Sequence, residues 1–140
     1  QNPPQDCYLV VMSELAYRLT LQRGSMFSAM YKPWFEFSIV HRFNPTDFTP
    51  TPNVFAALFR FVKKTSPLLP FEQRLQYQKF IQKAFGNGQS IRNNLKHAFS
   101  VMKLDSALQE LSMSKKTKPS QLNLKQWVSL YNVLQYRKLL

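Results

Sequence analysis

FNPTDFTPTPNVFAALFRFVK, residues 43 to 63, joins a proline-rich loop to an apolar and aromatic run. A residue that precedes proline is pushed towards extended backbone, so the loop is expected to stay open. The three residues concerned are Asn44, Thr49 and Thr51. The run from Val54 to Lys63 has the composition of a β-strand. Phe48 is the aromatic of the loop, and composition alone favours a core side chain in a strand connection.

A second strand is expected immediately before this loop. Residues Phe35 to Phe43 alternate at period two, which is typical of a strand with two different faces. The loop between the two strands is too short for a crossover helix, so we predict that they pair antiparallel. Tyr8 to Met12, YLVVM, is a continuous apolar run and predicts a strand buried on both faces of a parallel sheet.

Helical patterns fill much of the remaining chain. Ser13 is expected to cap a helix in which Leu15 and Leu19 meet the sheet. From Phe71 onwards the apolar period changes to 3.6 residues, which predicts several amphipathic helices. Asn123 is expected to cap the last of them. The expected fold class is therefore α/β at the front of the chain and all-α behind it.

The charge of the chain is strongly asymmetric. Its 140 residues contain 19 Lys and Arg against 7 Asp and Glu, a net charge of +12. Residues 1 to 62 have five basic and four acidic side chains, whereas residues 63 to 140 have fourteen and three. A positive field of this kind attracts phosphate groups or anionic lipids.

Several function classes find little support in the sequence. Cys7 is the only cysteine, which excludes an internal disulfide and fits a reducing compartment. No apolar run approaches the roughly 20 residues of a membrane span, and there is no signal-peptide pattern. His41 and His97 are far apart, so no metal is expected. The chain starts at Gln1 directly before an apolar strand, and we expect it to be the back part of a longer protein.

Four segments resemble the rRNA adenine-N6 methyltransferases of the Erm and KsgA type. They are YLVVMSELAYRL (8–19), KPWFEFSIVHRFNPTDFTPTPNV (32–54), KAFGNGQSIRNNLKHAF (83–99) and QLNLKQWVSLYNVL (121–134). The first two are similar to the family's fifth and sixth strands with the loop into the seventh, and the others to its helical domain. The closing helix, with the short loop before it, is closer to the Erm branch.

The resemblance implies the last three strands of a class I methyltransferase sheet, with an antiparallel hairpin. Residues 1–65 would complete an S-adenosylmethionine-dependent domain, and residues 66–140 would form a helical RNA-binding domain. The family's glycine-rich cofactor loop, acidic ribose ligand and Asn-x-Pro-aromatic motif all lie upstream of the matching region. Asn2-Pro3-Pro4 is no substitute, since Gln5 occupies the aromatic position. We therefore expect the missing N-terminal part to bind S-adenosylmethionine, and this fragment alone to be inactive.

The same resemblance assigns roles to particular side chains. Phe48 matches the aromatic that stacks on a flipped adenine, a role that needs π-surface. The net charge of the back half favours a phosphate-contacting surface, although a solvated face is the alternative for any one residue. The candidate RNA-binding residues are Lys79, Lys83, Arg92, Asn93, Lys96, Lys115 and Lys116.

Two classes of function follow from these patterns. The first is an rRNA adenine-N6 methyltransferase, for which the Erm-type resemblance implies 23S rRNA and macrolide resistance, with a KsgA-type small-subunit enzyme as the alternative. The second is a non-catalytic RNA-binding module. A lipid-surface role is weaker, because no stretch places exposed Trp or Phe opposite a Lys/Arg face. A monomer in the cytoplasm, without a membrane partner, is expected in either case.

Overall fold

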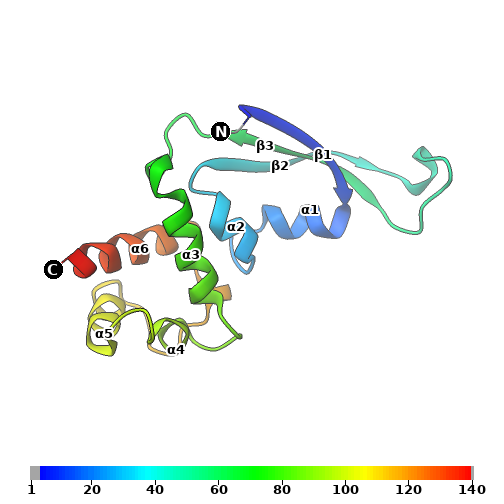
Figure 1. The fold of residues 1–140 in the computed structure, drawn as a ribbon. Helices are drawn as coiled ribbons and strands as arrows, with labels where there is room; N and C mark the ends of the chain where they lie inside the picture. The colour runs from blue at the N-terminus through cyan, green and yellow to red at the C-terminus, as the bar shows by residue number, and fades with distance from the viewer. Residues whose placement is uncertain (1–3, 140) are drawn as a thin grey trace.

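The computed structural model describes residues 4–139, with side chains as far as residue 135. A three-stranded sheet and two helices come first, and four further helices follow (Figure 1). The elements of the first part are β1 (Asp6–Met12), α1 (Ser13–Thr20), α2 (Met26–Tyr31), β2 (Phe35–Phe43) and β3 (Ala56–Lys63). Those of the second part are α3 (Arg74–Phe85), α4 (Ile91–Leu95), α5 (Val101–Glu110) and α6 (Leu124–Leu139). Short 3-10 turns lie at Pro45–Asp47, Phe71–Gln73 and Pro119–Gln121.

The strand order is β1-β3-β2, and both pairings are antiparallel. The predicted pairing of the two strands around the proline-rich loop is therefore confirmed, although β3 begins at Ala56 and not at Val54. Phe37 lies opposite Phe61 and Ile39 opposite Phe59, so aromatic side chains of both strands share one face. A register shift after Ile39 marks a β-bulge in β2.

β1 departs from the prediction made for its apolar run. It pairs antiparallel with β3, and side chains on one of its faces are exposed, with 51% of Tyr8 and 56% of Val10 accessible. A continuous apolar run does not reveal the direction of its partner strand, because direction depends on residues distant in sequence. Described residues pack only against the other face of this strand, and even there Leu9 is 46% exposed.

α1 covers part of that other face (Figure 1). Ala16 and Leu19 of α1 pack against Ala57 and Phe59 of β3 in a small core of their own. The prediction for Leu19 is thus confirmed, but Leu15 is exposed and does not join this core. Ser13 is also not the cap that the sequence suggested, since Met12 occupies the N-cap position without a side-chain hydrogen bond.

α2 joins the sheet to the helices behind it. Ser25 caps α2 by accepting a hydrogen bond from the backbone N–H of Ser28. Pro33 has no N–H with which to bond the Ala29 carbonyl one turn earlier. The hydroxyl of Tyr77 on α3 donates to that carbonyl instead, at 2.8 Å. The indole N–H of Trp34 likewise donates to the Leu69 carbonyl at 2.8 Å, and this bond fastens the linker before α3.

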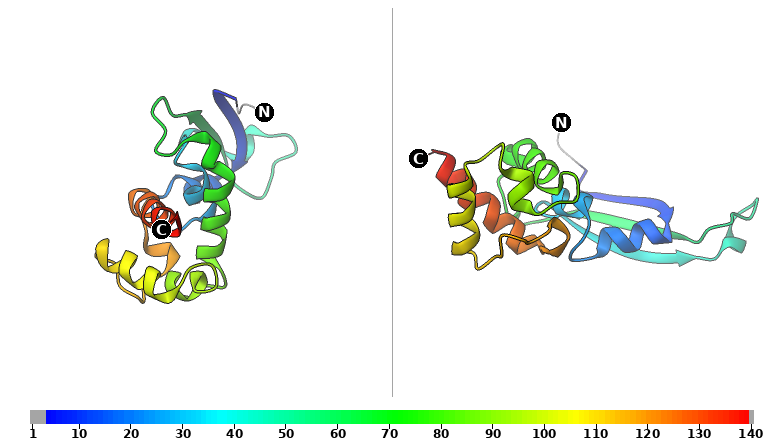
Figure 2. Two further views of the ribbon diagram at one scale, coloured as in Figure 1. Left: turned by 60° about the vertical axis from the view of Figure 1, so that its left-hand side comes forward. Right: turned by 90° about the horizontal axis from the view of Figure 1, so that it is seen from below.

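The four later helices enclose the main hydrophobic core, and Figure 2 shows them gathered at one end of the sheet. Trp127 of α6 stacks on Phe85 of α3 with ring centroids 5.5 Å apart. The predicted cap of the last helix is confirmed, because the Asn123 side chain accepts from the Gln126 N–H at 2.9 Å. The core also takes in Ala29, Met30, Trp34 and Phe35 from before residue 65. The division at residue 65 therefore stays a prediction.

Candidate nucleic-acid interface

The proline-rich loop lies at the end of the sheet farthest from α3 to α6 (Figure 1). Its first turn is closed by the Asn44 N–H, which donates to the Asp47 carboxylate at 2.8 Å. Phe48 follows in extended conformation, and its ring meets the Phe43 ring edge-on with centroids 5.4 Å apart. The loop therefore holds Phe48 against the end of β2.

Phe48 is neither buried nor fully exposed. Its ring contacts the Phe43 ring, and the residue stays partly accessible. A partly accessible aromatic suits stacking on a base. The same contact is also expected in a small apolar cluster with a purely structural role, so the stacking role of Phe48 stays a prediction.

The join between α3 and α4 connects two helices that both have candidate RNA-binding residues. The Asn94 side-chain amide donates to the carbonyls of Ala84 at 2.8 Å and Phe85 at 3.2 Å. Gly86 ends α3 at a φ of 39°, and a Cβ built there would lie 2.7 Å from the Asn94 side chain. This tight join fixes the direction in which α4 leaves α3.

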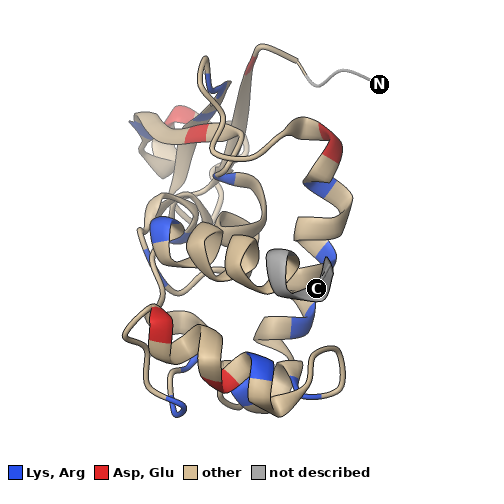
Figure 3. Ribbon diagram, turned by 90° about the vertical axis from the view of Figure 1, so that its left-hand side faces the viewer, with Lys and Arg blue, Asp and Glu red and all other residues tan. Residues whose placement is uncertain are grey.

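The candidate residues on these two helices are all at least partly accessible. Lys79 and Lys83 are exposed on α3, one turn apart. Asn93 and Lys96 are exposed on and just after α4, whereas Arg92 is half-buried. Lys115 and Lys116 are exposed in the loop that follows α5. Figure 3 shows Lys and Arg along α3 and around α4 and α5, with few acidic residues among them.

The structure brings Arg92 and Lys115 together around a residue that the sequence analysis passed over. The Asp105 carboxylate of α5 accepts from Arg92 Nε at 2.6 Å and from Arg92 Nη2 at 3.2 Å. Lys115 Nζ lies 3.4 Å from the same carboxylate. The only signal in the sequence was that Asp105 is one of three acidic residues in a very basic half.

The ion pair favours the charged forms of Asp105 and Arg92. The hydrogen bond from Arg92 lowers the pKa of the Asp105 carboxyl, and the nearby Lys115 ammonium lowers it further. The same hydrogen bond raises the pKa of the Arg92 guanidinium. Two cations and one anion therefore share this corner of the molecule, which leaves one net positive charge.

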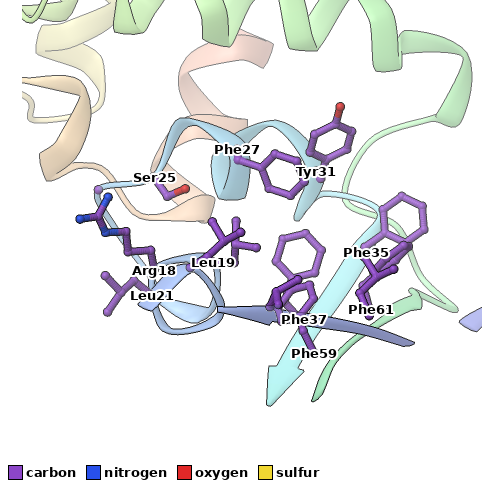
Figure 4. A pocket seen from close by; sticks show the side chains of 14 residues that line it. Arg18, Leu19, Leu21, Ser25, Phe27, Tyr31, Phe35, Phe37, Phe59 and Phe61 are labelled. Atoms are coloured by element: carbon purple, nitrogen blue, oxygen red, sulfur yellow. The ribbon is translucent and has the colours of Figure 1, made fainter. Parts of the chain in front are cut away.

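A large cavity lies on the α1 side of the sheet (Figure 4). Its volume is about 920 Å³, and its lining includes the aromatic rings of Phe27, Tyr31, Phe35, Phe37, Phe59 and Phe61. No Asp or Glu is among the described residues that line it. S-adenosylmethionine carries ribose hydroxyls, an amino acid group and a sulfonium charge, all of which need polar partners. The cavity does not fit that cofactor.

The described residues also include no metal-binding cluster and no membrane-spanning helix. Among residues 4–139, no three His, Cys, Asp or Glu side chains gather as a metal site would require. None of the helices in the described part of the chain is long and apolar enough to cross a membrane.

Comparison with known proteins places these features in a family. The family model described as ribosomal RNA adenine dimethylase matches residues 1–136. The mycinamicin-resistance protein MyrB of Micromonospora griseorubida is 27% identical over 127 residues, which are 89% of this chain and 41% of that protein. Ribosomal RNA small subunit methyltransferase A of Halothermothrix orenii is 25% identical over 138 residues, 92% of this chain and 46% of that protein. The chain thus spans less than half the length of these two relatives.

Solved structures agree on the fold. The structure of the 23S rRNA methyltransferase ErmE has a TM-score of 0.74 at 24% identity, covering 94% of this chain and 55% of that one. The structure of a dimethyladenosine transferase from Plasmodium falciparum has a TM-score of 0.71 at 18% identity, and the match covers 96% of this chain and 57% of that one. The expected fold class, the last strands of a methyltransferase sheet followed by helices, is confirmed. Because the family model matches nearly the whole sequence, the chain belongs to the ribosomal RNA adenine dimethylase family.

Proposed function

We propose that this chain is the rear part of an enzyme that transfers methyl groups from S-adenosylmethionine to the N6 amine of an adenine in rRNA. The observation that carries the proposal is the family match across residues 1–136, which includes both the loop with Phe48 and the basic helices. Upstream residues would bind the cofactor, since the described residues offer no suitable site. The protein would act in the cytoplasm as a monomer.

The two parts of the chain would have different tasks. In the first, residues 1–65, the loop would present Phe48 to an adenine that has left its base stack, because an extruded base needs an aromatic surface in place of its neighbours. In the second, residues 66–140, the basic residues would contact phosphates and supply affinity without reading sequence. The residues assigned to that surface are Lys79, Lys83, Arg92, Asn93, Lys96, Lys115 and Lys116.

Among rRNA substrates, 23S rRNA is the one that we favour. The closing segment at residues 121–134 is closer to the Erm branch, and MyrB is named for resistance to mycinamicin. Methylation of 23S rRNA with resistance to macrolides is therefore our first candidate. Small-subunit rRNA is the second, because the Halothermothrix orenii relative is named as a small-subunit methyltransferase.

The deciding experiment follows radiolabelled methyl transfer by the complete gene product. Naked 23S rRNA, 16S rRNA and small ribosomal subunits are the substrates, each with labelled S-adenosylmethionine. We expect label in the N6-methyladenine of 23S rRNA, whereas label in the small-subunit substrates alone would select the second candidate. Binding of both RNAs without any transfer would overturn the enzyme proposal in favour of a non-catalytic RNA-binding module. The 140-residue chain serves as a control that is expected to transfer nothing.

A further inference from the structure

Three segments of the basic half meet at the Asp105 carboxylate. Arg92 comes from α4, Asp105 from α5, and Lys115 from the loop after α5. Both carboxylate oxygens bond the guanidinium, at 2.6 Å and 3.2 Å, and the second also lies 3.4 Å from the ammonium. One carboxylate thus contacts the charged groups of two basic side chains.

Backbone hydrogen bonds hold the loop in the position that this arrangement needs. The Met113 N–H donates to the Leu108 carbonyl at 2.8 Å, where α5 gives way to the loop. The Thr117 carbonyl accepts from the Ile91 N–H at 2.9 Å, which ties the loop to the first turn of α4. Lys115 lies between these two hydrogen bonds, which hold the backbone of the loop next to α4.

Stability alone is a weak reason for this ion pair. The side chains of Arg92 and Asp105 are 31% and 24% exposed, and that of Lys115 is 66% exposed. Ion pairs that reach solvent contribute little to folding. The pair does, however, fix the plane of the guanidinium, since Asp105 engages two of its five N–H donors and leaves the others with a set direction.

We propose that Asp105 is a positioning residue for RNA, which presents the guanidinium of Arg92 and the ammonium of Lys115 as a preordered pair that binds one phosphate group. The inference rests on the proposed function only in taking rRNA as the ligand. Side chains that are ordered in advance lose less entropy on binding, so preordering strengthens an interaction without adding a contact. Asp105 itself does not touch the phosphate.

Asp105→Asn tests the proposal by the sign of its effect. A count of charges predicts tighter binding, because the variant removes a negative charge from an RNA-binding surface. Positioning predicts the opposite, a dissociation constant raised about two- to tenfold at fixed salt. The measurement is fluorescence anisotropy of the complete gene product with a labelled RNA hairpin that contains unpaired adenines.

Glu72→Gln is the matched control. Glu72 is an exposed carboxylate in the turn Phe71–Gln73, which precedes α3, whereas α4 follows the other end of that helix. Glu72→Gln also removes one negative charge, so RNA binding by this variant is expected to stay unchanged or to tighten. Equal tightening by both variants would overturn the positioning role.

A double-mutant comparison separates positioning from a general structural role. In a background that carries Arg92→Gln and Lys115→Gln, no cation remains for Asp105 to place, so adding Asp105→Asn should no longer weaken binding. A merely structural defect would weaken binding in both backgrounds and would contradict the proposal. If Asp105→Asn fails to fold by circular dichroism, Arg92→Lys decides the question. It keeps the charge but loses the two-point bond, and we expect weaker binding, whereas unchanged binding would overturn the proposal.

The outcomes for this inference and for the proposed function are distinguishable. RNA binding that weakens in Asp105→Asn, together with no methyl transfer by the wild type, would support the positioning role and reject the enzyme. Methyl transfer by the wild type, together with tighter RNA binding by Asp105→Asn, would support the enzyme and reject the positioning role.

Discussion

The sheet part of the chain, residues 4–63, and the helical part, residues 71–135, differ in how fully they bury their apolar side chains. The core between the helices contains residues from all four of α3 to α6, several of them wholly buried. The separate core under the sheet consists of four buried residues, Ala16, Leu19, Ala57 and Phe59. The opposite face of β1 meanwhile exposes Tyr8, Val10 and Met12. The helices bury their apolar side chains against one another and against Ala29, Met30, Trp34 and Phe35, whereas β1 has apolar side chains on a face that no described residue covers.

Charge divides the chain in a similar place. The acidic and basic side chains of residues 1–62 nearly balance, whereas basic side chains dominate residues 63–140. The part with the complete core thus has the charged surface, and the part with the incomplete core has the loop with Phe48. Affinity for RNA and action on one base should therefore fail separately when each part is altered.

The largest expected effect is a difference in folding stability between a variant of the helical part and a variant of the sheet part. Trp127 is 2% exposed and packs against the rings of Phe85 and Phe80, so Trp127→Ala should destabilise the fold by about 3–5 kcal/mol. Val10→Ala on the exposed face of β1 should change the free energy of unfolding by less than about 1 kcal/mol. Urea denaturation monitored by circular dichroism measures both. Similar losses in the two variants would contradict the difference in burial.

A smaller effect is expected where α2 meets the helical core. Tyr77→Phe removes the donor for the Ala29 carbonyl and should cost about 1–3 kcal/mol, because that buried oxygen has lost its partner. Tyr131→Phe is the matched control, since the buried Tyr131 hydroxyl has no hydrogen-bond partner among the described residues. The control should be neutral or stabilising. An equal loss of stability in both variants, measured by thermal denaturation, would show that the Tyr77 hydrogen bond does not itself stabilise the contact between α2 and the helical core.

Structural features that depend on neighbouring residues were predicted correctly from the sequence. Alternation over Phe35–Phe43 and the short proline-rich loop were enough for the β2–β3 pairing, and Asn123 was a recognisable cap. The direction of β1 was missed because it depends on β3, more than 40 residues away. A local pattern has no information about such a partner.

The candidate site was predictable only in its charges. Counting Lys and Arg located the basic half, but Asp105 has no motif, and its meeting with Arg92 depends on how α4 and α5 cross. Tyr77 was also missed, although Pro33 leaves the Ala29 carbonyl in need of a donor. The proline indicates which carbonyl lacks a helical partner, but it does not indicate which distant residue donates to it.

The third prediction concerns Phe48 and tests action on one base. Phe48→Ala should sharply lower single-turnover methyl transfer by the complete gene product, because the loss of a base–aromatic stack costs about 1–3 kcal/mol. Affinity for rRNA and its salt dependence should change little, since one base contributes less than many phosphates. Phe48→Tyr and Phe48→Trp should retain more activity than Phe48→Leu. Leu performing as well as Tyr, or an unfolded Ala variant, would make Phe48 a core residue.

The smallest effect is expected for single cations of the helical part. If Lys79 neutralises one phosphate, Lys79→Gln should flatten the slope of log affinity against log salt by about 0.7–0.9, and the same holds for Lys83, Arg92 and Lys96. Arg18→Gln on α1 is the control, because it removes an exposed cation from the sheet part and should leave the slope unchanged. Filter binding over a range of salt concentrations measures each slope. Unchanged slopes in all four variants would make these side chains a solvated face, and a flattened slope in Arg18→Gln would extend the RNA surface onto the sheet part.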